Sequence, residues 1–133
     1  MAKILLVEDD ASLREIYSAG FTSVNFQVAT ANDVEEALAM AVRERPDLIV
    51  LDVMMPKISG FDVLDILRST PETKSVKVVM MTALSQDADR KRGEALGVSR
   101  YLVKSQVTLP DLIKAVQEEL GETGTAPATP PAA

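Results

Sequence analysis

Four short apolar runs in the sequence end directly at residues that can hold a metal ion or a phosphoryl group. Glu8 and Asp9 follow the first of these runs, and Asp52 follows a second. Thr82 and Lys104 follow two more. An aspartate carboxylate can attack phosphorus and form an aspartyl phosphate, and carboxylate oxygens suit Mg²⁺. A hydroxyl can donate a hydrogen bond to a phosphoryl oxygen, and an ammonium group can pair with its charge.

The runs that carry these residues alternate with helical patterns along the chain. Short continuous apolar runs are typical of strands buried on both faces of a parallel sheet, and the segments between them have the spacing of amphipathic helices. The expected strands are 4–7, 26–28, 48–51, 76–81 and 101–103. This pattern predicts an α/β fold of five β–α units with a doubly wound, five-stranded parallel sheet. Ligands bind outside the carboxyl ends of such strands, which is where all five candidate residues would meet.

Three of the expected helices begin at residue pairs typical of a capping box. The pairs are Asn32 with Glu35, Ser59 with Asp62, and Thr108 with Asp111. Gly121 marks the end of the last helix.

The composition excludes several classes of function. The chain has 133 residues, which suits one domain. It contains no Cys and no His, so thiol and imidazole catalysis, disulfides and a phosphohistidine within this chain are excluded. The formal net charge of −6 and the aromatic content of 4% argue against a nucleic-acid-binding surface.

The two ends of the chain differ in character. The apolar run near the start, Ile4–Val7, is too short for a signal peptide or a membrane span. We therefore expect a cytoplasmic protein that does not bind a membrane. Residues 122–133 contain three of the seven prolines and no large apolar residue. This composition predicts a flexible tail or truncated linker after a domain of residues 1–121.

Four stretches of the sequence resemble the receiver (response-regulator) domains of two-component signalling, in particular the single-domain chemotaxis regulators. They are Lys3–Asp10, Pro46–Phe61, Val78–Ala83 and Gly97–Lys104. Together they extend the resemblance from about residue 2 to residue 120, and the segment LDVMMPKISG is its most specific part. The resemblance implies a flavodoxin-like sheet with strand order 2-1-3-4-5.

The resemblance also implies roles for the candidate site residues. Asp52 would be the phosphoacceptor. Glu8 and Asp9 would hold Mg²⁺, with Asp9 as a direct ligand and Glu8 acting through water. The backbone carbonyl of Met54 would be a further metal ligand, and Lys104 would bind the phosphoryl group. The protein would be no enzyme beyond its own phosphotransfer and dephosphorylation at Asp52.

Thr82 and Tyr101 would form the switch pair of such a domain. A phosphoryl group adds about −1.5 to −2 charge, and movement of Thr82 toward it would let Tyr101 turn inward. The alternative for Tyr101 is a half-buried strand aromatic whose hydroxyl faces water. The polar segment 85–96, which has little apolar surface to hold it, would change conformation. The implied partners are a sensor histidine kinase or phosphotransfer protein, a downstream protein that contacts residues 85–120, and a second copy of the chain.

Ser105 departs from the family pattern, and the residues at positions 54 and 84 would affect how fast the phosphoryl group is hydrolysed. The family usually has a cis proline directly after the lysine, where this chain has Ser105. A cis bond before serine costs about 2.5–4 kcal/mol, so we expect a trans peptide there. Met54 and Leu84, two positions after Asp52 and Thr82, have no side-chain group to orient a water. We therefore expect a phosphoryl half-life of minutes or longer.

The sequence also allows other interpretations, and two of them lack a residue or turn that they would need. Taken singly, Asp10 would be a helix N-cap, Thr82 a turn hydroxyl and Lys104 a solvated charge. A degenerate receiver could bind partners without phosphorylation. A hydrolase with an aspartate nucleophile usually has a second Asp two positions later, where Met54 stands. A nucleotide or flavin binder needs a glycine-rich turn after the first strand, where Glu8, Asp9 and Asp10 stand instead.

Overall fold

The structure is a computed structural model that describes residues 2–52, 60–82, 91 and 94–121. Five parallel strands form one sheet in the order β2-β1-β3-β4-β5, which confirms the predicted fold class and strand order. The strands are β1 (Lys3–Val7), β2 (Gln27–Ala31), β3 (Leu48–Asp52), β4 (Lys77–Thr82) and β5 (Arg100–Val103). The helices are α1 (Ala11–Ser23), α2 (Val34–Glu44), α3 (Gly60–Ser69) and α5 (Leu109–Glu119), with a short 3₁₀ helix η1 (Lys104–Gln106) after β5.

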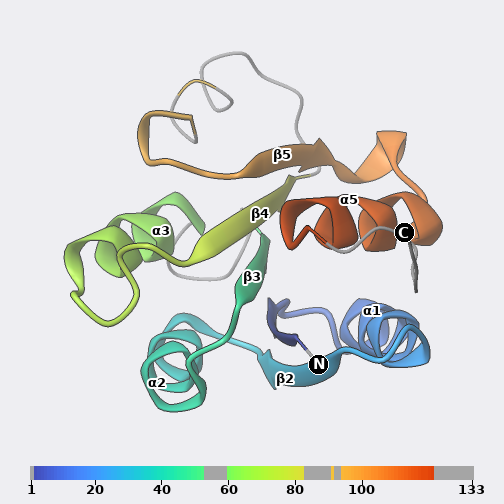
Figure 1. Ribbon diagram of the computed structural model, residues 1–133, viewed down its shortest axis with the longest axis horizontal. Coiled ribbons are helices and arrows are strands. Elements are labelled where there is room, and N and C mark those ends of the chain that lie inside the picture. Colours follow the sequence, from blue (N-terminus) through green and yellow to red (C-terminus); the bar gives the residue numbers. More distant parts are fainter. Residues whose placement is uncertain (1, 53–59, 83–90, 92–93, 122–133) are drawn as a thin grey trace.

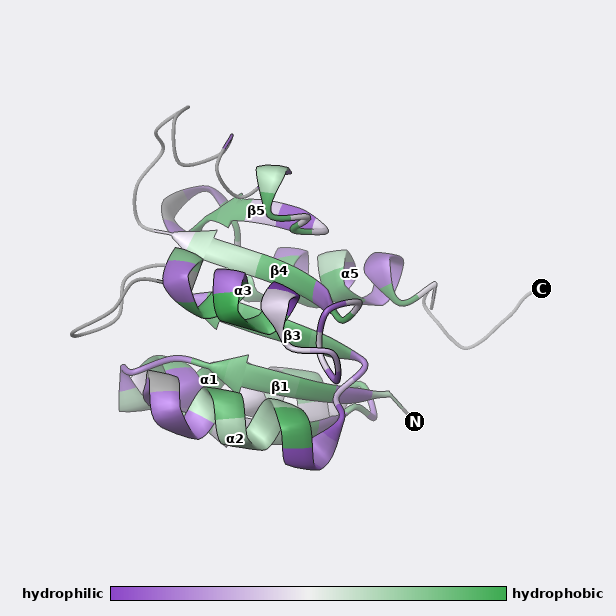
Figure 2. Cartoon of the chain, turned by 90° about the vertical axis from the view of Figure 1, so that its left-hand side faces the viewer, coloured by the Kyte–Doolittle hydropathy of each residue, from purple (hydrophilic) through white to green (hydrophobic). Residues whose placement is uncertain are grey.

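Helices cover both faces of the sheet. Figure 1 shows α1 and α5 on one side of the strands and α2 and α3 on the other. The buried apolar residues accordingly form two clusters, one centred on Leu5, Ile49 and Met80 and the other on Leu6 and Val50. Neighbouring strand residues face opposite clusters because side chains alternate along a strand. This explains why the central strands are continuous apolar runs, which are mostly green in Figure 2.

The strand register brings the carboxyl ends of the central strands to one edge. Val7 of β1 lies opposite Leu51 of β3, and Asp52 lies opposite Met81 of β4. Thr82 in turn lies opposite Val103 of β5. The polar residues that end or follow these strands therefore lie side by side, as the sequence predicts.

Some element boundaries differ from the sequence-based prediction. β2 runs from Gln27 to Ala31 and not over 26–28. It is an edge strand of mostly intermediate burial, so its residues Ala29 and Thr30 lack the apolar run seen in the centre. Phe26 instead packs its ring edge-on against Phe21, with 6.2 Å between ring centroids.

The helix caps are partly as predicted. Thr108 and Asp111 form the predicted capping box at the start of α5. The capping box predicted for α2 is wrong. The N-cap is Asp33, which accepts from the Glu36 backbone N–H, and Glu36 Oε1 accepts from the backbone N–H of Asn32 and not from that of the N-cap. Ser59, the predicted cap of α3, lies outside the described residues. Of the helices in the described ranges, none is long and apolar enough to cross a membrane.

Candidate phosphoryl and metal site

Lys104 bridges two buried carboxylates at the carboxyl edge of the sheet. Its Nζ lies 3.1 Å from Asp52 Oδ2 and 3.1 Å from Glu8 Oε1. The Glu8 and Asp52 side chains are only 3% and 4% exposed, whereas that of Lys104 is 21% exposed. Two carboxylates of this burial need a cation or a proton between them, because like charges in a low dielectric repel strongly. The ammonium group of Lys104 neutralises part of this negative charge.

Asp9 completes a cluster of three carboxylates with Glu8 and Asp52. One ligand oxygen from each lies within 4.8 Å of the others. Asp9 is exposed, so the cluster is open to solvent on its side. Three carboxylates against one ammonium leave an excess of negative charge. Hard oxygen ligands in a partly open site are the type that Mg²⁺ takes while it keeps waters for a phosphate, so the donor set fits the metal.

The environment of Glu8 changes its proton affinity. Burial, followed by the hydrogen bond and charge of Asp52, raises the pKa of Glu8 to about 7 even though Lys104 opposes the rise. Burial alone would lower the pKa of Lys104, but the two carboxylates outweigh burial and raise it above its ordinary value. Lys104 is therefore charged at neutral pH, while Glu8 is poised to take or release a proton.

The loop after β1 is held by contacts with α1. The Asp10 backbone N–H donates to Glu8 Oε2 at 3.3 Å, and the Asp10 side chain caps α1 by accepting from the Leu13 backbone N–H at 3.1 Å. Asp10 is thus the helix N-cap that its position suggested. Arg14 Nη1 donates to the Glu8 carbonyl oxygen at 2.8 Å.

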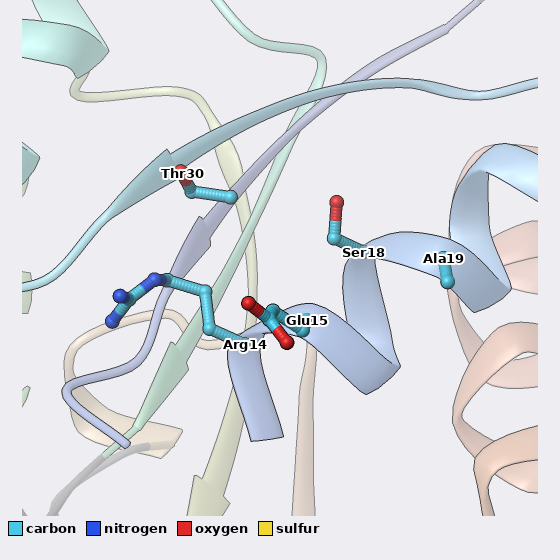
Figure 3. Close-up of a pocket in the computed structure, with 5 residues that line it drawn as sticks. All are labelled: Arg14, Glu15, Ser18, Ala19 and Thr30. Carbon is cyan, nitrogen blue, oxygen red and sulfur yellow. The ribbon is translucent and has the colours of Figure 1, made fainter. Parts of the chain in front are cut away.

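Arg14 is a site residue that sequence reasoning missed. In Figure 3 its side chain extends from α1 away from Ser18 and Ala19. A hollow of about 430 Å³ lies between α1 and β2, and it is lined by Arg14, Glu15, Ser18, Ala19 and Thr30. Its sequence position gives no signal that separates it from an ordinary solvated helix arginine.

The predicted switch residues are both buried. Thr82, at the end of β4, is 0% exposed. Tyr101 on β5 is 9% exposed and belongs to the apolar cluster beneath α2 and α3. Its hydroxyl oxygen is buried, so the alternative in which that hydroxyl faces water is wrong for this structure.

The lysine loop takes the predicted form. No cis peptide occurs in the described part of the chain, which includes Lys104 and Ser105. Lys104 begins the η1 turn and still reaches Asp52 without the family's proline. Met54, Leu84 and most of the segment 85–96 lie outside the described residues, so the predictions made for them are not addressed by this geometry.

Comparison with known proteins agrees with this arrangement. Residues 4–117 match the family model described as response regulator receiver domain. The chain is 43% identical over 102 residues to a probable transcriptional regulator, ycf27, of Porphyridium aerugineum, covering 77% of this chain and 41% of that protein. It is also 43% identical over 103 residues to the response regulator PleD of Caulobacter vibrioides, covering 77% of this chain and 23% of PleD. The chain thus spans well under half the length of these relatives.

Solved structures with the same fold include two informative cases. The chemotaxis protein CheY4 of Vibrio cholerae superposes with a TM-score of 0.83 at 34% identity, covering 89% of this chain and 98% of CheY4. The BeF₃-activated receiver domain of Klebsiella pneumoniae RstA superposes with a TM-score of 0.80 at 26% identity, covering 89% of this chain and 97% of that domain.

Proposed function

Because the chain belongs to the response regulator receiver domain family, we propose that it is a phosphorylation-activated signalling switch with Asp52 as phosphoacceptor. The observation that carries the proposal is the position of Lys104, whose ammonium group contacts Asp52 and Glu8 at 3.1 Å each. This arrangement places a fixed positive charge beside a buried carboxylate, which is where a transferred phosphoryl group needs one.

The proposed reaction moves a phosphoryl group from a phosphohistidine of the partner kinase or phosphotransfer protein to Asp52. An ionised Asp52 oxygen attacks phosphorus, the new O–P bond forms and the N–P bond breaks. The imidazole nitrogen of the partner leaves and takes up a proton. Lys104, which contacts the Asp52 carboxylate at 3.1 Å, then pairs with the added phosphoryl charge.

Mg²⁺ is the cofactor proposed for this step. Glu8, Asp9 and Asp52 would hold it, together with the Met54 backbone carbonyl. Of the pair Glu8 and Asp9, Asp9 would contact the metal directly and Glu8 would act through water. When bound, the metal neutralises charge on the phosphoryl oxygens. The chain's own residues orient the acceptor: the β3 backbone fixes Asp52 at the sheet edge, and the Asp10 N–H and Arg14 hold the Glu8 loop beside it.

Thr82 and Tyr101 are proposed to couple phosphorylation of Asp52 to a conformational change at the protein surface. Thr82 ends the strand next to Asp52, and Tyr101 lies one strand further. A hydroxyl drawn toward the phosphoryl oxygens would change the space available to the tyrosine. The surface formed by residues 85–120 is then the proposed contact for a downstream protein or a second copy of the chain. A cytoplasmic location, a domain of residues 1–121 and a tail of 122–133 complete the proposal.

Intact-mass measurement tests this function directly. The protein is incubated with acetyl phosphate with and without Mg²⁺, beside the Asp52→Asn variant and a control, Asp65→Asn, which changes an exposed carboxylate of α3. We expect one phosphoryl group on the wild type and on the control, dependent on Mg²⁺, and none on Asp52→Asn. A folded wild type that takes up no phosphoryl group would favour a degenerate receiver that binds partners without phosphorylation.

A further inference from the structure

Arg68, near the end of α3, donates hydrogen bonds to four backbone carbonyls. Its Nη1 lies 2.7 Å from the Val76 oxygen and 3.2 Å from the Lys74 oxygen. Its Nε lies 2.9 Å from the Leu96 oxygen, and its Nη2 lies 2.9 Å from the Gly97 oxygen. All three guanidinium nitrogens are engaged, which only the planar fork of arginine can do. Burial lowers the pKa of Arg68, but an arginine in a protein stays charged.

The four carbonyls belong to two separate segments that lead into β4 and β5. Lys74 and Val76 lie within the three residues before Lys77, the first residue of β4. Leu96 and Gly97 lie just before the Ser99 backbone N–H, which donates to the Val78 carbonyl at 2.8 Å. One guanidinium therefore ties together the starts of the two strands whose opposite ends carry Thr82 and Lys104.

The second of these segments also contains the end of a helical segment. Glu94 and Ala95 are helical, and the Gly97 backbone N–H returns to the Glu94 carbonyl at 3.0 Å. Gly97 has a φ of 76°, and a Cβ placed on it would lie 3.5 Å from Arg68 Nε. A positive charge at the carboxyl end of a helical turn interacts favourably with the exposed carbonyls. The glycine lets the chain turn so that both carbonyls face Arg68.

We propose that Arg68 is a positioning residue of the switch, which holds residues 94–97 against α3 while the site end of the sheet responds to phosphorylation. The inference rests on the proposed function. α3 begins eight residues after Asp52 and ends beside Arg68, so this helix links the phosphoacceptor to the start of β5. With the start of β5 fixed, a change at Asp52 is directed to the carboxyl end of β5, where Lys104 follows the strand.

Hydrogen exchange of single backbone amides tests the proposal. The amides of Gly97 and Ser99 are followed by NMR in the wild type, in Arg68→Ala and in Arg68→Lys, each with Mg²⁺ and with or without beryllium fluoride as phosphoryl mimic. Arg68→Lys keeps the positive charge but lacks the planar guanidinium group. It provides the measurement if the alanine variant unfolds. Arg43→Lys is the matched control, because Arg43 is an exposed arginine of α2 with a side chain 67% exposed.

In the wild type and in Arg43→Lys, we expect both amides to exchange at the same rate with and without the mimic. In Arg68→Lys, exchange at both amides should rise about tenfold or more, as the loss of charge-assisted hydrogen bonds implies. That exchange should also become dependent on the mimic, whereas amides of β1 should be unchanged. A purely structural role would raise exchange throughout the sheet and leave the mimic without effect, which would overturn the proposal.

Two further results would overturn it as well: wild-type exchange rates at Gly97 and Ser99 in the Arg68→Lys variant, or a wild type whose own two amides respond to the mimic. A failure of the proposed function looks different. In that case the mimic would change no amide around Asp52 in any variant, while the faster exchange of Arg68→Lys without the mimic would still be measured.

Discussion

Glu8 and Lys104 form an ion pair of 3.1 Å in which the carboxylate side chain is 3% exposed and the lysine side chain 21% exposed. The same ammonium group contacts Asp52. Glu8 and Asp52 therefore share one positive charge, so the loss of Lys104 leaves two buried carboxylates without their common cation. The first two predictions follow from this sharing.

Replacing Lys104 by alanine should weaken phosphoryl transfer and retention. A charge-assisted hydrogen bond contributes about 1.5–3 kcal/mol, so the rate of phosphorylation of Asp52 should fall about tenfold or more. Phosphorylation and dephosphorylation are followed by intact mass with acetyl phosphate and Mg²⁺. Lys114→Ala, an exposed lysine of α5, is the matched control and should behave as wild type. Unchanged kinetics in Lys104→Ala would contradict the role assigned to the lysine.

The binding of Mg²⁺ should depend on pH through Glu8. The pKa of Glu8 is raised from 4.5 to about 7 by burial and by Asp52, and a carboxylate that holds the metal through water attracts it more strongly when it is deprotonated. The affinity for Mg²⁺ should therefore rise with pH between about 6 and 8, and binding should release protons. Titration calorimetry in two buffers of different ionisation enthalpy measures both quantities.

The same raised pKa predicts the pH dependence of stability without metal. Because folded Glu8 holds its proton more tightly than unfolded Glu8, its stabilising contribution is fully present below pH 4.5 and is lost as pH rises through about 7. Urea unfolding at pH 5 and pH 7.5, in wild type and Glu8→Gln, isolates this contribution. If the two proteins show the same pH dependence, Glu8 is not the titrating group.

Replacing Thr82 by valine should separate phosphorylation from the switch. Valine keeps the shape of the fully buried side chain but has no hydroxyl. We expect Asp52 still to be phosphorylated, while the NMR signals of a ¹³C-labelled Tyr101 ring no longer respond to beryllium fluoride. Thr30→Val, on the edge strand β2, is the control and should respond as wild type. A Tyr101 response that persists in Thr82→Val would rule out the coupling of the two residues.

The capping box of α5 should contribute measurably to stability. The Thr108 hydroxyl accepts from the Asp111 backbone N–H at 3.2 Å, and Asp111 Oδ2 accepts from that of Thr108 at 3.0 Å. Thr108→Ala should lower the free energy of unfolding by about 1 kcal/mol, whereas Thr108→Ser should be close to wild type. Urea unfolding at neutral pH measures both. Equal stability of the two variants would show that the side-chain cap does not matter here.

The sequence predicts the sheet and the meeting of the site residues well, because both depend on strong local signals. Continuous apolar runs mark the central strands, and parallel pairing alone brings Glu8, Asp52 and Lys104 to one edge. The prediction is less accurate for the edge strand β2, since residues such as Ala29 and Thr30 have neither a continuous apolar run nor a clear alternation. The cap of α2 was one residue off because Asn32 and Asp33 are both good N-cap residues.

Other features could not be predicted because they depend on contacts between distant segments. No local pattern shows that Lys104 bridges two carboxylates and does not extend into solvent. Arg14 and Arg68 look in the sequence like ordinary charges on helix surfaces, yet each donates to backbone carbonyls of another segment. The direction of a long side chain is set by the tertiary structure and not by its neighbours in the chain.

The most direct test of the central claim is to locate the phosphoryl group. After reaction with acetyl phosphate and Mg²⁺, the protein is reduced with borohydride, which converts an aspartyl phosphate to homoserine, and is then digested for peptide sequencing by mass spectrometry. We predict homoserine at position 52 alone, and none in a sample without Mg²⁺. Homoserine at Asp9 or at any other aspartate, with position 52 unmodified, would contradict the account.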